Sequence, residues 1–152
     1  MRDQSLKRFL SRYVPLLVWL VFISFASSGG FSASNTSRII GPLVLWLFPN
    51  TSPERLELIH IVVRKISHFL EYAVLGFLAA RAFRTSPSVG LRQRWFILAL
   101  GLIVVYAFLD EYHQSFVPSR TPSIVDSFID ILGGLTALLV LRRHQRAEGS
   151  SN

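Results

Sequence analysis

The chain has 152 residues, enough for a single domain, and 51% of them are hydrophobic. Its mean hydropathy of +0.43 is too high for an ordinary soluble domain. The 16 Lys and Arg residues outnumber the 9 Asp and Glu residues, and the net charge of +7 points either to nucleic acid or to membrane topology. The absence of cysteine excludes disulfides, thiolate metal sites and a cysteine nucleophile.

Four apolar segments are predicted to cross a membrane as helices, because a spanning helix needs about 17–25 mostly apolar residues. In chain order they cover about 13–28, 61–83, 95–109 and 124–141. The first segment has an alternative interpretation as a cleaved secretory signal, since basic residues precede it and the small residues Ala26, Ser27 and Ser28 end it. The Ser- and Gly-rich stretch 27–37 is predicted to be a loop.

A shorter apolar segment, Ile39 to Phe48, cannot cross a membrane and is predicted to be interfacial or re-entrant. Ser52 then has the character of a helix cap and Pro53 suits a first helical position, so an unbroken helix is predicted from Pro53 through Phe83. Residues 118–122 contain two prolines and break the chain before the fourth span, where Ser123 is the predicted cap.

The basic residues are divided unevenly between the two predicted sides of the membrane. The N-terminus, the 81–94 loop and the C-terminus carry most of the 16 basic residues, but only Asp3 and Glu148 of the acidic ones. The positive-inside rule therefore predicts a multi-pass protein of the bacterial cytoplasmic (inner) membrane with both termini in the cytoplasm. Because the positive charge is spread over three short flanks, no nucleic-acid partner is predicted.

Ionisable residues gather at the predicted extracytoplasmic ends of the spans. Those between Lys65 and Tyr72 lie within about 120° of one helix face, while Asp110 and Gln114, like Asp126 and Asp130, are four residues apart and share a face. Charged groups inside a span are costly, so they are expected to face the bundle interior and to converge in one polar pocket. The predicted ligand-binding residues are Lys65, His68, Glu71, Tyr72, Asp110, Glu111, Gln114, Arg120 and Asp126.

The chemistry of this pocket has several interpretations. The candidates for acid–base or nucleophilic catalysis are His68, His113, Asp110 and Glu111. No His-Glu-x-x-His or Gly-x-Ser-x-Gly motif is present, so neither a metal site nor a serine hydrolase is predicted, and no cofactor is expected. Lys65 and Arg120 suit phosphate oxygens, but a closed ion-pair network would equally explain the residue set.

The sequence resembles the VanZ-like family of small bacterial membrane proteins, which is named for a teicoplanin-resistance protein. The matching elements lie between about 61 and 141, and they are Lys65-x-x-His68-x-x-x-Tyr72, Asp110-Glu111-x-x-Gln114-x-Phe116-x-x-x-Arg120, Asp126 and Gly133. The resemblance implies an all-α bundle of four transmembrane helices in a single domain, 1–152. This chain departs from the family at Ser119, often Gly, and at Asp130, often Asn.

These observations together favour a membrane protein whose extracytoplasmic pocket binds a lipid-linked or cell-envelope ligand. Its expected partners are membrane lipids and a lipid-linked cell-wall precursor. A role in glycopeptide resistance is implied by the resemblance alone. The alternatives are a membrane enzyme that acts on a phosphate- or pyrophosphate-bearing lipid, and a small transporter or assembly partner.

Overall fold

The computed structural model describes residues 2–28, 33–118 and 122–150, and this part of the chain is all-helical. Its helices are α1 (Arg2–Ser27), α2 (Ala33–Leu47), α3 (Pro53–Arg84), α4 (Val89–Gln93), α5 (Trp95–Gln114) and α6 (Ile124–Ser150). The predicted all-α fold class is therefore confirmed.

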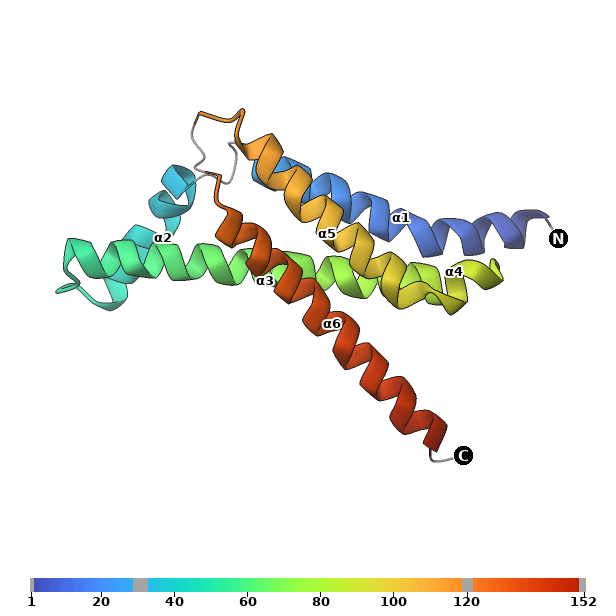
Figure 1. The fold of residues 1–152 in the computed structure, drawn as a ribbon. Coiled ribbons are helices and arrows are strands. Elements are labelled where there is room, and N and C mark those ends of the chain that lie inside the picture. Colours follow the sequence, from blue (N-terminus) through green and yellow to red (C-terminus); the bar gives the residue numbers. More distant parts are fainter. Residues whose placement is uncertain (1, 29–32, 119–121, 151–152) are drawn as a thin grey trace.

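Helix α3 is the centre of the molecule. It runs through the middle in Figure 1, with α1 and α5 along one side and α6 crossing it obliquely. It packs most extensively against α6, and then against α5, α1 and α2. The indole of Trp19 in α1 donates to the backbone oxygen of Glu71 at 2.9 Å, which fixes α1 against α3. The largest buried apolar side chains come from four helices and are Ile23, Tyr72, Leu75, Ile103 and Leu138.

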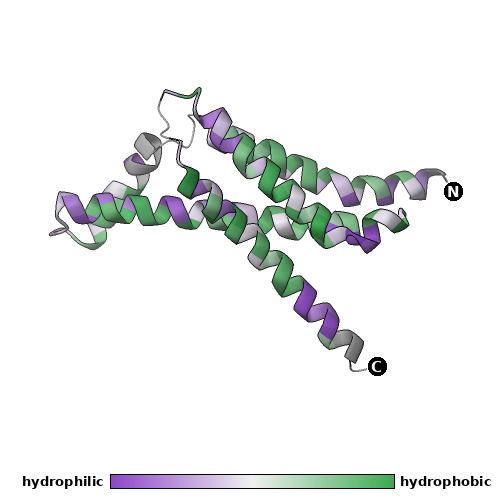
Figure 2. Cartoon of the chain, viewed as in Figure 1, coloured by the Kyte–Doolittle hydropathy of each residue, from purple (hydrophilic) through white to green (hydrophobic). Residues whose placement is uncertain are grey.

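Three helices are long and apolar enough to cross a membrane: the segments Asp3–Ser27, Trp95–Gln114 and Ile124–Ala147. Large apolar side chains on them stay exposed, such as Val18 at 60% and Ile97 at 73%, as expected of surfaces that face lipid. Figure 2 shows these apolar residues along the helices, with polar residues concentrated toward the ends. The predicted fourth span, α3, is not among the three, because ionisable residues interrupt its apolar sequence, and its crossing stays a prediction.

Several predicted boundaries agree with the structure. Helix α3 begins at Pro53, and the Ser52 hydroxyl accepts a hydrogen bond from the Arg55 amide at 3.4 Å, so this predicted cap is confirmed. Helix α5 continues past Leu109 to Gln114, and α6 begins directly after Ser123.

One boundary was predicted wrongly, because residues 33–37 belong to helix α2 and not to a loop. Two helices are also longer than the spans predicted within them: α1 begins at Arg2, and α6 continues past 141 to Ser150. Once a helix has started, each added residue gains a backbone hydrogen bond, so helices extend beyond their apolar segments into polar sequence. Whether α2 lies at a membrane interface stays a prediction.

Glycines allow α6 to approach α3 closely. A Cβ on Gly133 would collide with the backbone carbonyl of Phe69, and a Cβ on Gly76 would lie 2.7 Å from the Gly134 oxygen. Real Cβ atoms essentially never approach backbone atoms so closely, so only glycine fits at these positions. The small-residue contact predicted from Gly133 and Gly134 is thus the point where α3 and α6 cross.

The ends of the helices are arranged as the sequence predicts. The start of α1, helix α4 and the end of α6 lie toward the same end of the molecule in Figure 1. Helix α2, the end of α5 and the start of α6 lie toward the other end. Which end faces the cytoplasm stays a prediction. For brevity we call these the basic end and the acidic end.

Candidate functional site

At the acidic end, Asp126 of α6 joins two cations of α3. Its Oδ1 lies 3.0 Å from Lys65 Nζ, and its Oδ2 lies 3.1 Å from Arg64 Nη2. The carboxylate is 6% exposed, whereas the Lys65 and Arg64 side chains are 39% and 26% exposed. The cations therefore form the rim of the site and the carboxylate lies beneath them.

One turn further along both helices, His68 pairs with Asp130. His68 Nδ1 lies 3.0 Å from Asp130 Oδ1, and the two side chains are 9% and 0% exposed. The spacing along each helix is consistent with both pairs, because residues three or four apart on α3 share one face, as do residues four apart on α6. A carboxylate in this position orients an imidazole and fixes which ring nitrogen carries the proton.

Helix α5 completes the site. Gln114 Nε2 donates to Asp110 Oδ2 at 2.9 Å, one turn apart on the same helix. Glu111 Oε2 accepts from the Ser123 amide at 2.6 Å, which attaches the end of α5 to the start of α6. Asp110 also lies near enough to Tyr72 and Asp130 to interact with both electrostatically, so α3, α5 and α6 all contribute to one group. We call this group the polar cluster: Arg64, Lys65, His68, Tyr72, Asp110, Glu111, Gln114, Asp126, Ser127 and Asp130.

Some buried polar atoms of the cluster have no hydrogen-bond partner among the described residues. They include the Tyr72 hydroxyl, Gln114 Oε1 and Asp130 Oδ2, one from each of the three helices. Tyr72, Gln114 and Asp130 are all 0% exposed. An unpartnered buried polar atom typically costs about 1–3 kcal/mol, so three in one place are a feature that needs an explanation.

The structure brings most of the predicted ligand-binding residues together. Glu71 is half-buried and lies near enough to His68 to interact with it electrostatically. The His113 side chain is exposed and lies outside the cluster, although it was a predicted catalytic candidate. Arg120 lies outside the described residues.

The ligand-binding prediction lacked Arg64, Ser127 and Asp130. Asp130 had already been expected in the pocket from its spacing four residues after Asp126, although it was not named as a ligand-binding residue, whereas nothing in the sequence singled out Arg64 next to Lys65. Among the described residues, no three His, Asp or Glu side chains are placed to hold a metal ion. The carboxylates bind cations, an imidazole, an amide and a backbone N–H of the protein instead.

An all-helical chain with three long apolar helices and a buried polar cluster is a small helical membrane protein. The family model described as VanZ/LLP1 matches residues 11–145, so the chain belongs to the VanZ/LLP1 family. The match extends beyond the predicted 61–141, and it includes most of α1 and all of α2, which the sequence resemblance had left outside. No curated protein matches the chain, and no solved structure does.

Proposed function

We propose that this VanZ-family protein crosses the cytoplasmic membrane four times and uses the polar cluster to bind a lipid-linked or cell-envelope ligand from the extracytoplasmic side. The packing of α3 supports a fourth crossing. Helices α1, α5 and α6 contact α3, and in the middle of α3 His68 is buried while Arg64, Lys65 and Glu71 are partly buried. This partial cover by protein makes charged groups tolerable in a span.

The observation that carries the proposal is the set of unpartnered atoms on three helices. The Tyr72 hydroxyl can donate or accept, while Gln114 Oε1 and Asp130 Oδ2 can only accept. Polar atoms of a ligand that bonded to these groups would remove the free-energy cost of burying them. Buried polar groups are often retained because they have a function, since replacing them with apolar residues of similar size is often neutral or increases stability.

The charges of the cluster indicate which ligand groups fit. The four buried carboxylates outnumber the two rim cations, both of which pair with Asp126. These carboxylates belong to Asp110, Glu111, Asp126 and Asp130. An added phosphate at the buried level would be repelled, whereas hydroxyl and amino groups would donate to the free acceptors. The proposed ligand group is therefore a sugar- or amine-bearing head group, such as the saccharide of a lipid-linked cell-wall precursor.

Lipid analysis of the purified protein tests this proposal. The wild-type protein, Tyr72→Phe, Gln114→Leu and the control Tyr112→Phe would be purified in mild detergent from bacteria, and their bound lipids compared by mass spectrometry. Tyr112 is 65% exposed and outside the cluster, so it controls for the loss of a tyrosine hydroxyl. We expect wild type and Tyr112→Phe to retain one envelope lipid that both cluster variants lose.

The stability of Tyr72→Phe separates a binding role from a structural one. Since the Tyr72 hydroxyl has no partner in the described structure, its removal is expected to leave the protein as stable as wild type or slightly more stable. Loss of the bound lipid without loss of stability supports a ligand site. If wild type and Tyr72→Phe carry identical lipids, the polar cluster is not the binding site.

A second candidate function is a membrane enzyme acting on a phosphate- or pyrophosphate-bearing lipid. The pairing of His68 with buried Asp130 favours it, because this arrangement orients a general base. We expect His68→Ala to abolish phosphate release from such a lipid, and the exposed His113→Ala to preserve it. Full activity of His68→Ala would eliminate this candidate.

A link to teicoplanin comes to this chain from its family alone. Expression of the chain in a teicoplanin-sensitive bacterium would test it, with Gln114→Leu as the inactive control. We expect the minimal inhibitory concentration of teicoplanin to rise when the wild-type chain is expressed and not when the variant is. If the wild-type chain leaves this concentration unchanged, the protein does not confer teicoplanin resistance.

A further inference from the structure

A pocket of about 520 Å³ lies at the basic end and shares no residue with the polar cluster. Figure 1 shows that α6 diverges from α3 toward this end, and residues of α3, α4, α5 and α6 line the pocket. The residues that matter for the argument are Phe77, Arg81, Arg84, Arg92, Trp95 and Leu141. Its volume falls within the range of about 300–1,000 Å³ that is usual for ligand pockets.

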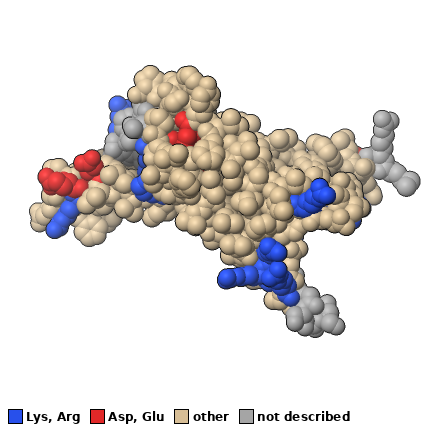
Figure 3. Space-filling model, in the orientation of Figure 1, with Lys and Arg blue, Asp and Glu red and all other residues tan. Residues whose placement is uncertain are grey.

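The three arginines of the pocket are held by neutral groups. Arg81 Nη2 donates to the Ser11 backbone oxygen at 3.3 Å, and Arg92 Nη1 donates to the Ser86 oxygen at 3.0 Å. None of the three forms an ion pair with a carboxylate in the part of the chain that the structure describes. Neutral groups therefore position these guanidinium groups without cancelling their charge. In Figure 3, basic side chains stand out at this end of the molecule, and the most visible acidic ones lie toward the other.

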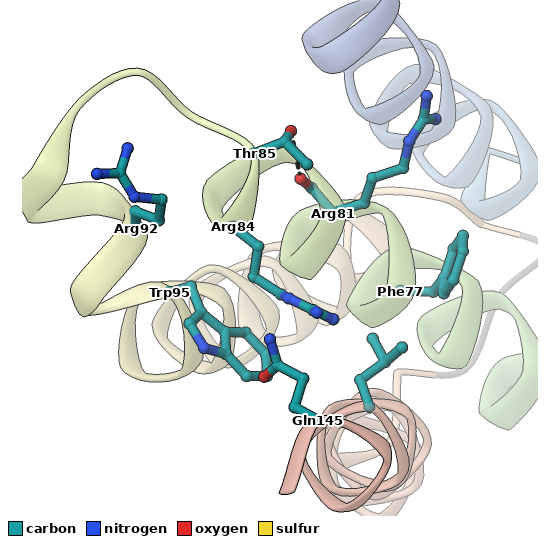
Figure 4. Close-up of a pocket in the computed structure, with 8 residues that line it drawn as sticks. Phe77, Arg81, Arg84, Thr85, Arg92, Trp95 and Gln145 are labelled. Carbon is teal, nitrogen blue, oxygen red and sulfur yellow. Dashed lines mark hydrogen bonds between the residues drawn. The ribbon is translucent and has the colours of Figure 1, made fainter. Parts of the chain in front are cut away.

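Arg84 occupies the middle of the pocket. Figure 4 shows its guanidinium between Trp95 and Phe77, and its Cζ lies 5.4 Å from the centre of the Trp95 ring. The Gln145 amide, turned so that its oxygen faces the arginine, accepts from Arg84 Nε at 2.9 Å. The guanidinium is thus held in place by a ring and an amide, as a preorganised anion site requires.

The wall beside the arginines is apolar. Phe77 is 49% exposed on α3, and Leu141 is half-buried on α6. Trp95 stands at the start of a membrane-spanning segment, the level at which tryptophan commonly marks the edge of a bilayer. The pocket therefore offers cations at the predicted membrane surface and apolar side chains just beneath them.

We propose that this pocket binds the phosphate head group of an anionic phospholipid, in the leaflet that the positive-inside rule assigns to the cytoplasm. Arginine forms two parallel hydrogen bonds with phosphate oxygens, and the Arg84 guanidinium in the middle of the pocket is placed to do so. The guanidinium groups of Arg81 and Arg92 point away from Arg84 in Figure 4, and they add positive charge around the pocket rather than direct contacts. Phe77 and Leu141 would contact the start of an acyl chain, which free phosphate lacks. Basic pockets between helices on this side of a membrane are suited to anionic head groups.

Lipid binding to the full-length protein in neutral detergent tests the proposal. Phosphatidylglycerol, phosphatidylcholine and inorganic phosphate would be added separately, with binding followed by native mass spectrometry and by the shift in melting temperature. We expect saturable binding of phosphatidylglycerol, little binding of phosphatidylcholine, and no melting shift with inorganic phosphate at the same concentration.

Two variants change the pocket in different ways. Arg84→Gln removes its central charge, and Gln145→Glu places a carboxylate against Arg84 that would compete with the lipid phosphate. Each is expected to weaken phosphatidylglycerol binding at least about tenfold, the usual effect of losing one charge-assisted hydrogen bond. If Arg84→Gln does not fold, Gln145→Glu gives the same test with the arginine retained.

The controls separate this site from general charge and from the polar cluster. Arg143→Gln removes an exposed α6 arginine that does not line the pocket, and Tyr72→Phe changes only the other site. Both are expected to bind phosphatidylglycerol as wild type does. Equal binding by wild type, Arg84→Gln and Gln145→Glu would overturn the proposal. If inorganic phosphate shifts the melting temperature as much as phosphatidylglycerol does, the pocket binds free phosphate and not a phospholipid head group.

Discussion

The two ends of this helical bundle treat charge in opposite ways. At the acidic end, carboxylates are buried and pair with partners on neighbouring helices, as Asp126 does with Lys65 and Asp130 with His68. At the basic end, three arginines line an open pocket and contact only neutral groups in the described structure, with Arg84 at the pocket's centre. Charges paired inside a protein contribute to its fold, whereas uncancelled charges gain most from an external ligand.

The geometry of α3 and α6 explains the difference. The helices meet at Gly76, Gly133 and Gly134, close to the polar cluster, and α6 then diverges (Figure 1). Close approach brings side chains of opposite charge within ion-pair distance. Divergence leaves room for a pocket, so the same two helices produce a packed site at one end and an open one at the other.

The largest effect is expected from Gly133→Ala, which attacks the crossing itself. The new methyl group would collide with the Phe69 carbonyl, and we expect a loss of about 3 kcal/mol in the free energy of unfolding. Denaturant titration in detergent would measure it. Gly101→Ala is the matched control, because nothing lies within 4 Å of a Cβ there. Equal stability of the two variants would contradict the close crossing.

Asp126→Asn is expected to have the next largest effect. It removes the carboxylate partner of Lys65 and one partner of Arg64, and because those cations are partly exposed, we expect a loss of about 2 kcal/mol rather than the full value for a buried pair. The control is Asp3→Asn, whose pair with Lys7 is 75% exposed on both sides and should contribute no more than about 0.5 kcal/mol. A similar change in both variants would show that burial of Asp126 does not matter.

Arg84→Gln tests the basic end in the same assay. In the absence of lipid we expect a change of less than about 1 kcal/mol in the free energy of unfolding, since this arginine has no carboxylate partner in the described structure. The variant should instead lose the stabilisation that phosphatidylglycerol gives to wild type. If Arg84→Gln lost much of the free energy of unfolding without lipid, the arginine would stabilise the fold itself, and the two ends of the bundle would not differ in the role of their charges.

The smallest effect is expected from Ser52→Ala, which lies in neither site. Loss of this cap of α3 should cost about 0.5 kcal/mol. The Ser52 hydroxyl also lowers the pKa of Glu54 through a hydrogen bond, so that pKa should rise in the variant. A lowered pKa stabilises the fold above the ordinary carboxyl pKa and ceases to do so as the pH falls through the folded value. The difference between wild type and variant should therefore shrink in acid, as pH-dependent unfolding and NMR titration of Glu54 would show.

Much of the site was predictable because helical spacing links residue number to direction. Three- and four-residue spacings placed His68 and Tyr72 on one face of α3, and Asp126 and Asp130 on one face of α6, before any contact was known. The charge pattern also predicted that the termini and the 81–94 loop share one end, as Figure 1 shows. Exposed His113 shows the limit of this reasoning, because its distance from Asp110 along the chain did not decide which side of α5 the cluster uses.

The sequence by itself determined the class of fold, the helical segments and the residues capable of polar chemistry, because hydropathy and periodicity are local properties of the chain. Only the tertiary structure decided which partners met: Asp126 with Arg64 as well as Lys65, Asp130 with His68, and Glu111 with the Ser123 amide. It also decided that the arginines around Arg84 border a pocket. These features depend on the angle and closeness at which α3 and α6 cross, which packing around glycines sets and residue spacing along one helix does not.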